Sequence, residues 1–228
     1  MPNSKKQASK AALSHRIYLV DDHPVTREGI VSLLNRAGMT VCGQAENAPA
    51  GFEGIMSTDP DLAIVDISLP TTSGIDLVKN IKASAPSIPI LVVSMHDEAL
   101  YAERSLRAGA KGYIMKQEAS KMIVSAIHEI LNGGIYLSEK IKAKLLHGML
   151  TGKQQETPYT IDHLSDRELE VFRLIGNGHS TRQIAEKLRL IVKTIDSYRE
   201  HLKLKLNKAS GNELVQHAIQ WVQSEMKA

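Results

Sequence analysis

Four apolar runs in the first half of the chain are typical of buried strands, and each ends at a polar residue. Between residues 16 and 133 such runs alternate with amphipathic helical stretches, which is the pattern of a parallel sheet covered by helices. The carboxyl ends of parallel strands meet at one edge of an open sheet, where ligands bind. We therefore expect five polar residues to converge there: Asp21, Asp22, Asp66, Ser94 and Lys116.

This set of side chains indicates phosphoryl chemistry. Three close carboxylates repel one another and favour a hard divalent cation with oxygen ligands, for which Mg²⁺ is the best match. The cation and the Lys116 ammonium would neutralise an incoming phosphoryl group, so that Asp66 could attack phosphorus. Any one of the five could instead be a solvated strand end. All five in this order and spacing make that interpretation weak.

The same residues resemble the receiver domain of two-component response regulators over residues 16–134. The matching motifs are Asp21-Asp22, Asp66-x-x-Leu69-Pro70-x-x-x-Gly74, Ser94 and Gly112-Tyr113-x-x-Lys116. The resemblance implies an α/β doubly wound sheet of five parallel strands, near residues 17–21, 40–45, 62–66, 89–94 and 112–115. It also implies that a sensor histidine kinase phosphorylates Asp66.

The resemblance further implies a role for each polar residue at this edge. Asp22, Asp66 and the backbone carbonyl of Ser68 would hold Mg²⁺, with Asp21 acting mainly through bound water. Lys116 would pair with the phosphoryl oxygens. Ser94 and Tyr113 would form the switch pair. The Ser94 hydroxyl would move toward the phosphate, and the Tyr113 ring would turn inward behind it.

Composition and length are those of an ordinary globular protein, with 43% hydrophobic and 23% charged residues among 228. No apolar run approaches the length of a membrane span. Residues 1–15 are basic without an apolar core, so we expect a disordered tail or an upstream start site rather than a secretory signal. Cys42 is expected to be a buried thiol in a reducing cytoplasm. The nine histidines show no ligand-like clustering and are expected to be structural or surface residues.

The net charge of +3 is unevenly divided. Residues 17–150 hold 12 Lys/Arg against 15 Asp/Glu, whereas residues 182–208 hold 8 against 3. This local balance of +5 favours a nucleic-acid-binding element, although a solvated helix face could give the same count. Between the two regions, residues 135–159 are expected to form a linker that carries one helical segment.

The last part of the chain, residues 160–228, has helical periodicity throughout. Two short helices joined by a tight turn, the second basic on its outer face, predict a helix-turn-helix. A generic four-helix bundle would have the same periodicity. Two capping boxes mark the starts of the first two helices, and they are Ser165-x-x-Glu168 and Ser180-x-x-Gln183.

This region resembles the LuxR-type helix-turn-helix over about residues 160–224. Its motifs are Leu164-Ser165-x-Arg167-Glu168-x-Glu170-Val171, Ile184-Ala185-x-x-Leu188 and Lys193-Thr194-Ile195-x-x-Tyr198-Arg199. A receiver followed by this domain is the arrangement of the NarL/FixJ class of response regulators.

One departure concerns the start of the longer, recognition helix. The family usually has Ser or Thr there, whereas Ile191 and Val192 offer no side-chain oxygen. Losing a cap costs about 1 kcal/mol. We expect the helix start to fray, to move its cap to Thr194, or to be completed by a DNA phosphate.

Matching positions in the family imply that Asp196, Ser197 and Glu200 face base edges. The acids could accept from cytosine N4, or equally could pair within the helix, as Asp196 with Arg199 and Glu200 with Lys203. Basic side chains are better placed to touch phosphates. The full expected DNA-binding set is Arg182, Lys193, Thr194, Asp196, Ser197, Arg199, Glu200, Lys203 and Lys205.

The sequence is thus interpreted as a cytoplasmic response regulator, a phosphorylation-controlled transcription factor rather than an enzyme. Phosphorylation would promote homodimerisation and release or pair the DNA-binding domains on a two-fold promoter site. Expected partners are double-stranded DNA and a sensor histidine kinase, with RNA polymerase as a further candidate and no membrane. The rival is an aspartyl-phosphate phosphatase, but such an enzyme carries a second acid two residues after the nucleophile, where Ser68 stands.

Overall fold

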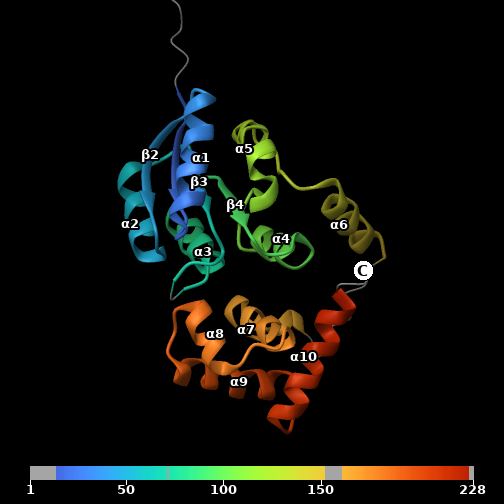
Figure 1. Ribbon diagram of the computed structural model, residues 1–228. Helices are drawn as coiled ribbons and strands as arrows, with labels where there is room; N and C mark the ends of the chain where they lie inside the picture. Colours follow the sequence, from blue (N-terminus) through green and yellow to red (C-terminus); the bar gives the residue numbers. More distant parts are fainter. Residues whose placement is uncertain (1–13, 71, 152–160, 226–228) are drawn as a thin grey trace, which may run out of the picture.

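The computed structural model describes residues 14–70, 72–151 and 161–225 (Figure 1). The expected basic tail and the turn-rich part of the linker therefore lie almost entirely outside the described residues. Five parallel strands form one sheet in the order β2-β1-β3-β4-β5, which confirms the doubly wound fold. The strands are β1 (Arg16–Val20), β2 (Thr40–Ala45), β3 (Leu62–Val65), β4 (Ile90–Ser94) and β5 (Gly112–Met115).

Helices cover both faces of the sheet, so the central strands are buried on both sides. Alternate strand residues such as Leu19 and Ile64 pack with α1 (Pro24–Arg36) and α5 (Lys116–Leu131). Their neighbours Val20 and Val65 belong to the core on the opposite face. There the covering helices are α2 (Ala48–Thr58), α3 (Gly74–Ser84) and α4 (Glu98–Arg107). Burial on two faces explains why these strands are continuous apolar runs.

The expectation that Cys42 is a buried thiol was wrong. Its side chain is half-buried, and its Sγ lies 3.5 Å from the carbonyl oxygen of Ile17. The physical reason is the position of β2 at the edge of the sheet, where one flank of the strand has no neighbour.

The C-terminal part of the chain is helical, as expected. A helix within the predicted linker, α6 (Glu139–Thr151), lies beside α4, where Lys144 Nζ donates to the Ala99 carbonyl at 3.1 Å. After a short 3₁₀ turn, η1 (Ile161–His163), four helices form the C-terminal domain. They are α7 (Asp166–Gly176), α8 (Thr181–Leu188), α9 (Val192–Lys205) and α10 (Gly211–Glu225).

Both predicted capping boxes are present, at the starts of α7 and α8. The start of α9 differs from one expectation. Ile191 is its N-cap and provides no side-chain hydrogen bond, so the cap has not moved to Thr194. The backbone turns sharply before this point, because Arg189 ends α8 in the left-handed conformation with φ 51°. Trp221 packs against Phe172 at a ring distance of 5.5 Å.

Within the described residues, no helix is both long and apolar enough to cross a membrane.

Gly74 illustrates how closely the chain is folded around Asp66. Its N–H donates to the carbonyl of Ile67 at 2.8 Å, and a Cβ at this position would lie 1.8 Å from the backbone oxygen of Asp66. The loop between β3 and α3 can therefore keep this path only with glycine at residue 74.

We predict that Gly74→Ala lowers the free energy of unfolding by at least about 1–3 kcal/mol, because a backbone oxygen must move to admit the methyl group. Gly29→Ala is the matched control, since no atom lies within 4 Å of its added Cβ in the interior of α1. That change should instead stabilise the chain by about 0.5–1 kcal/mol. Urea unfolding followed by circular dichroism measures both effects. An unchanged midpoint for Gly74→Ala would show that the loop is not constrained in this way.

Candidate functional site

Three carboxylates gather at the carboxyl edge of the sheet. Asp21 and Asp22 follow β1, Asp66 follows β3, and one ligand atom from each lies within 4.8 Å of the others. The side chains are exposed by only 2%, 8% and 1% respectively. The parallel pairing of β1 with β3 brings these acids together, because it aligns Val20 with Val65, the residues directly before Asp21 and Asp66.

Lys116 joins two of these acids. Its Nζ lies 2.8 Å from an oxygen of Asp21 and 2.8 Å from Oδ2 of Asp66. Burial lowers the pKa of Lys116, but Asp66 and Asp21 outweigh burial and raise it, so the ammonium stays charged. Burial raises the pKa of Asp66, and the negative charge of Asp21 raises it further. The charge of Lys116 and the N–H of Ser68 act in the opposite direction but do not cancel the effect of burial.

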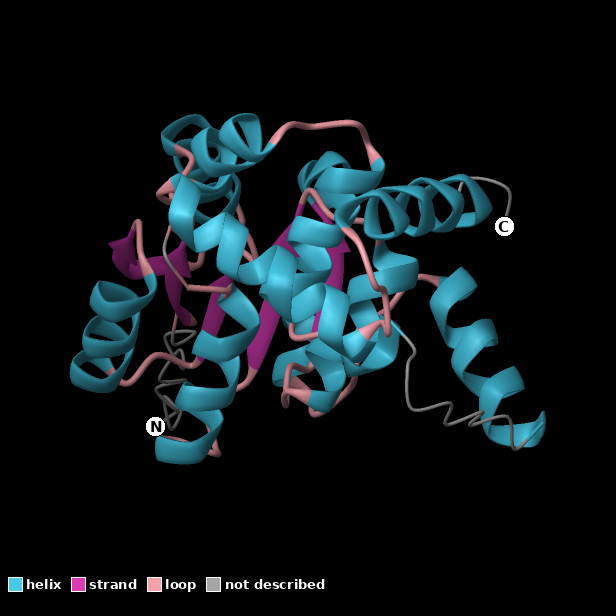
Figure 2. Cartoon of the chain, turned by 90° about the horizontal axis from the view of Figure 1, so that it is seen from below, coloured by secondary structure: helices cyan, strands magenta, loops and turns pink. Residues whose placement is uncertain are grey.

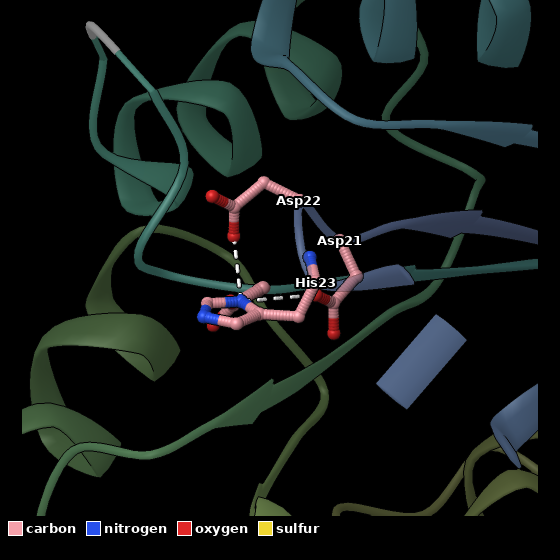
Figure 3. Close-up of side chains that lie close together, drawn as sticks. Asp21, Asp22 and His23 are labelled. Carbon is pink, nitrogen blue, oxygen red and sulfur yellow. Dashed lines mark hydrogen bonds and ion pairs between the residues drawn. The ribbon is translucent and has the colours of Figure 1, made fainter. Parts of the chain in front are cut away.

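His23 also belongs to the cluster, which the sequence interpretation missed (Figure 3). Its Nδ1 lies 2.7 Å from Asp22, 3.5 Å from Asp21 and 3.9 Å from Asp66. The expectation that no histidine clusters with possible ligands was therefore wrong. The signal in the sequence is its position directly after the acidic pair. In the structure the backbone N–H of His23 donates to Asp21 at 2.8 Å, which holds the two residues together.

The donor set fits a hard divalent cation. Oδ1 of Asp22 is buried and accepts no hydrogen bond, although the ring nitrogen of His23 lies close to it. Lys116 pairs with only two of the three carboxylates, and the excess negative charge of the cluster is one that oxygen-bound Mg²⁺ would offset. Ser68 stands beside them, and its N–H donates to Asp66 Oδ1 at 3.3 Å.

The two expected switch residues are both buried and meet through the backbone of His96. Ser94, at the end of β4, is fully buried, and its Oγ accepts from the N–H of His96 at 3.3 Å. The Tyr113 hydroxyl donates to the carbonyl of the same residue at 2.8 Å. The Tyr113 ring is 2% exposed and therefore already lies inside the domain.

The His96 side chain connects the loop after Asp66 to the C-terminal domain. Its Nε2 lies 2.8 Å from the hydroxyl of Ser68, and its ring stacks on Tyr101 at 4.5 Å. On the other side, Nδ1 lies 3.3 Å from Arg173 of α7, and Nε2 lies 3.6 Å from Glu170 of the same helix. Burial and the nearby Arg173 lower the pKa of His96 to about 3, so its ring is neutral at physiological pH.

Arg104 of α4 makes the most extensive polar contact between the domains. Its guanidinium donates to the carbonyls of Leu164 at 2.8 Å and Ile161 at 3.0 Å. It also pairs with Asp166 at 3.3 Å, and Lys79 of α3 approaches the same carboxylate at 3.4 Å. The start of α7 is thus held against α3 and α4.

The C-terminal domain also reaches the acid cluster itself. The Arg189 guanidinium lies 3.2 Å from Oδ2 of Asp22. Between the domains lies a cavity of about 290 Å³, with Asp22, Asp66 and His96 on one side and basic residues of the C-terminal domain on the other. In the view from the C-terminal domain (Figure 2), helices lie in front of the strands. The basic lining residues are Arg167, Arg173, Lys187 and Arg189.

The outer face of α9 is exposed and lies on the far side of the C-terminal domain from the sheet (Figure 1). Of the two expected acid pairs, Glu200 does pair with Lys203 at 2.9 Å. Asp196 has no ion-pair partner among the described residues. Lys205 is engaged by Glu168 of α7 at 2.6 Å. Six of the nine expected DNA-binding residues are exposed, namely Arg182, Lys193, Asp196, Ser197, Glu200 and Lys205, while Thr194, Arg199 and Lys203 are half-buried.

Comparison with known families agrees with this architecture. Residues 17–128 match the response regulator receiver domain, and residues 162–218 match the bacterial regulatory proteins of the luxR family. The chain is 35% identical over 209 residues to the oxygen regulatory protein NreC of Staphylococcus carnosus, covering 90% of this chain and 96% of the relative. The chain therefore belongs to the response regulators of the NarL/FixJ class, which join a receiver to a LuxR-type helix-turn-helix.

Solved structures support the same assignment. The response regulator RcsB of Salmonella typhimurium matches with a TM-score of 0.61 at 26% identity, covering 91% of this chain and 98% of RcsB. An RcsB–DNA complex matches with a TM-score of 0.54 at 27% identity, covering 89% and 96%. The chain is thus a phosphorylation-controlled, DNA-binding transcription regulator.

We predict that Arg104→Ala loosens the docking of the two domains. Two backbone carbonyls of the C-terminal domain would lose their donor, which costs on the order of 1–3 kcal/mol when they remain buried. Amide hydrogen exchange along α7 should become faster, and the radius of gyration from small-angle X-ray scattering should increase.

Arg107→Ala is the matched control for this prediction. Arg107 lies one turn further along the same helix, is 67% exposed and pairs only with Glu103 of α4. Its removal should leave both measurements at the parent values. Equal behaviour of the two variants would mean that the contacts of Arg104 do not hold the domains together.

Proposed function

We propose that Asp66 is the residue that accepts a phosphoryl group from a sensor histidine kinase. The observation that carries this proposal is the contact between Asp66 and Lys116 at 2.8 Å, with Asp66 among the residues that line the cavity between the domains. We assign the receiver to residues 16–134, the linker to residues 135–159 and the DNA-binding domain to residues 160–228, with residues 1–15 as a preceding tail.

In this proposal an Asp66 oxygen forms a bond to phosphorus while the bond from phosphorus to the donor's leaving group breaks. The ammonium of Lys116 offsets the negative charge that accumulates on the phosphoryl oxygens. It can do so because it already lies between the acids and needs no large movement. The burial of Asp66 keeps water from competing with the carboxylate or from readily hydrolysing the product.

Asp21, Asp22, Asp66 and the carbonyl of Ser68 would hold Mg²⁺. When bound, the cation supplies positive charge that screens the carboxylates from the phosphoryl group. The buried Oδ1 of Asp22, which accepts no hydrogen bond, supports this assignment.

Ser94 and Tyr113 are the proposed switch pair. A phosphoryl group on Asp66 offers new acceptor oxygens to the Ser94 hydroxyl. Both residues bond to the backbone of His96, so movement of one displaces the segment that contacts α7. The receiver could in this way pass the state of Asp66 to the DNA-binding domain.

The proposed output is binding of a homodimer to a two-fold promoter site in the cytoplasm, with RNA polymerase as a further partner. RcsB dimers have been seen bound to DNA, which supports the dimer. Because the outer face of α9 is exposed in the docked arrangement, pairing of two DNA-binding domains accounts for control better than uncovering of the helix. The signal reaches DNA through the proposed contact residues Arg182, Lys193, Thr194, Asp196, Ser197, Arg199, Glu200, Lys203 and Lys205.

We predict that acetyl phosphate and Mg²⁺ add one phosphate to the parent chain, seen as a single increment in intact mass. Asp66→Asn should abolish the increment because an amide is not a nucleophile toward phosphorus. Removing Mg²⁺ with a chelator should also prevent labelling, since the attacked group would keep its full charge. Asp76→Asn, an acid on α3 whose side chain is 48% exposed, is the control and should label normally. Undiminished labelling of Asp66→Asn would disprove the assignment.

For DNA, we predict that Arg199→Ala and Lys203→Ala weaken binding to specific and non-specific sequences alike. Each lost phosphate contact should reduce the slope of log affinity against log salt by about one unit. Lys121→Ala, an exposed lysine on α5, is the charge-matched control and should leave the slope unchanged. An unchanged slope in both α9 variants would argue against this helix lying in the groove.

The two acids of α9 should behave differently from the basic residues. If Asp196 or Glu200 reads a base, its replacement by Ala should remove discrimination worth roughly 1–3 kcal/mol at one position of the site. Glu200 already pairs with Lys203, so Glu200→Ala should instead strengthen binding to all sequences. Site selection with each variant distinguishes these results.

A further inference from the structure

We propose that the Arg189 guanidinium competes with the divalent cation for Asp22, so that docking of the DNA-binding domain and cation binding oppose each other. This inference rests on the function proposed above, in which Asp22 is a cation ligand. It adds a residue of the DNA-binding domain to the control of the phosphorylation site.

The competition follows from which carboxylate oxygens are already engaged. Lys116 lies against Asp21 and Asp66 and leaves Asp22 without an ammonium partner. Arg189 supplies the missing positive charge, at 3.2 Å from Oδ2 of Asp22. The other oxygen of this carboxylate is buried and accepts no hydrogen bond, although Nδ1 of His23 lies 2.7 Å from it. Asp22 is therefore the acid that a cation and the DNA-binding domain would both engage.

The charge count gives the direction of the effect. His23 aside, three carboxylates and the Lys116 ammonium carry formal charges that sum to −2, and docking of Arg189 changes this sum to −1. A smaller negative charge attracts a divalent cation less, and the guanidinium also repels the cation directly. Arg189 is 63% exposed, so solvent screens the interaction and the effect is modest.

The fold fixes Arg189 at this position. It ends α8 in a left-handed conformation, and its N–H donates to the carbonyl of Glu186 at 3.2 Å. The turn that follows leads directly into α9. Asp22, Asp66 and Arg189 line the same cavity of about 290 Å³, so the guanidinium and an incoming cation share one space.

Thermodynamic linkage makes the competition reciprocal. If docking weakens cation binding by some factor, then cation binding weakens docking by the same factor. Loading of the site would thus begin to separate the domains before any phosphoryl group arrives. The turn that holds Arg189 would then be free to move with α9.

The test is a Mg²⁺ titration of the full chain, followed by NMR shifts of the backbone amides after β1. Arg189→Asn removes the charge, and asparagine tolerates the left-handed backbone. This variant should bind Mg²⁺ about two- to fivefold more tightly than the parent, as expected for loss of an exposed ion pair. Arg189→Lys keeps the charge and should stay closer to the parent.

Lys140→Ala provides the control for overall charge. Lys140 is exposed on α6 and does not line the cavity. This variant should bind Mg²⁺ as the parent does. Tightening equal to that of Arg189→Asn would mean that net charge, not the contact with Asp22, sets the affinity, and would overturn the proposal.

Domain separation gives an independent measurement. Mg²⁺ should increase the radius of gyration of the parent in small-angle X-ray scattering, and should do so less in Arg189→Asn. Equal Mg²⁺ affinity of parent and variant, with normal labelling of Asp66 by acetyl phosphate, would overturn the competition and leave the proposed function standing. Absence of Mg²⁺-dependent labelling in the parent would instead overturn the proposed function, and the competition with it.

Discussion

The ion cluster of Asp21, Asp66 and Lys116 is the constraint around which the rest of the structure is arranged. Burying a carboxylate without a partner is costly, and burying two side by side adds their repulsion. The Lys116 ammonium, at 2.8 Å from both Asp21 and Asp66, offsets this energetic cost. Only a parallel sheet brings these positions together, because β1, β3 and β5 end at the same edge. The loops around the cluster must then be tight, as the contact of Gly74 with Asp66 shows.

One ammonium does not balance three acids, and the docked arrangement follows from that imbalance. The C-terminal domain offers four basic side chains to the shared cavity, and Arg189 pairs with the acid that Lys116 does not reach. Further polar contacts between the domains are those of Arg104 with the start of α7. An interface of ion pairs and carbonyl contacts releases more readily than an apolar one. Docking is therefore expected to be sensitive to any change in charge at the acid cluster.

Much of the fold and of the receiver site could be predicted from the sequence, because both depend on local patterns of apolar, polar and capping residues. Acids at the ends of apolar runs indicate the carboxyl edge of the sheet, and capping boxes indicate where helices begin. His96, Arg104 and Arg189 could not be found in this way. Their partners lie on another domain, and docking between domains leaves no periodicity in the sequence. His23 could have been predicted because it directly follows the acidic pair, whereas the spacing between histidines does not reveal it.

The position of α9 limits how phosphorylation can control DNA binding. Its outer face is exposed while the domains are docked, so docking does not work by covering the recognition helix. What docking fixes is the placement of the whole domain, through α7 and through the turn at Arg189. A two-fold DNA site requires two recognition helices at a set separation. A domain held against its own receiver cannot freely take that position, which supports the proposed control by pairing. The missing side-chain cap at Ile191 fits this account, because the first turn of α9 keeps backbone N–H groups that a DNA phosphate can engage.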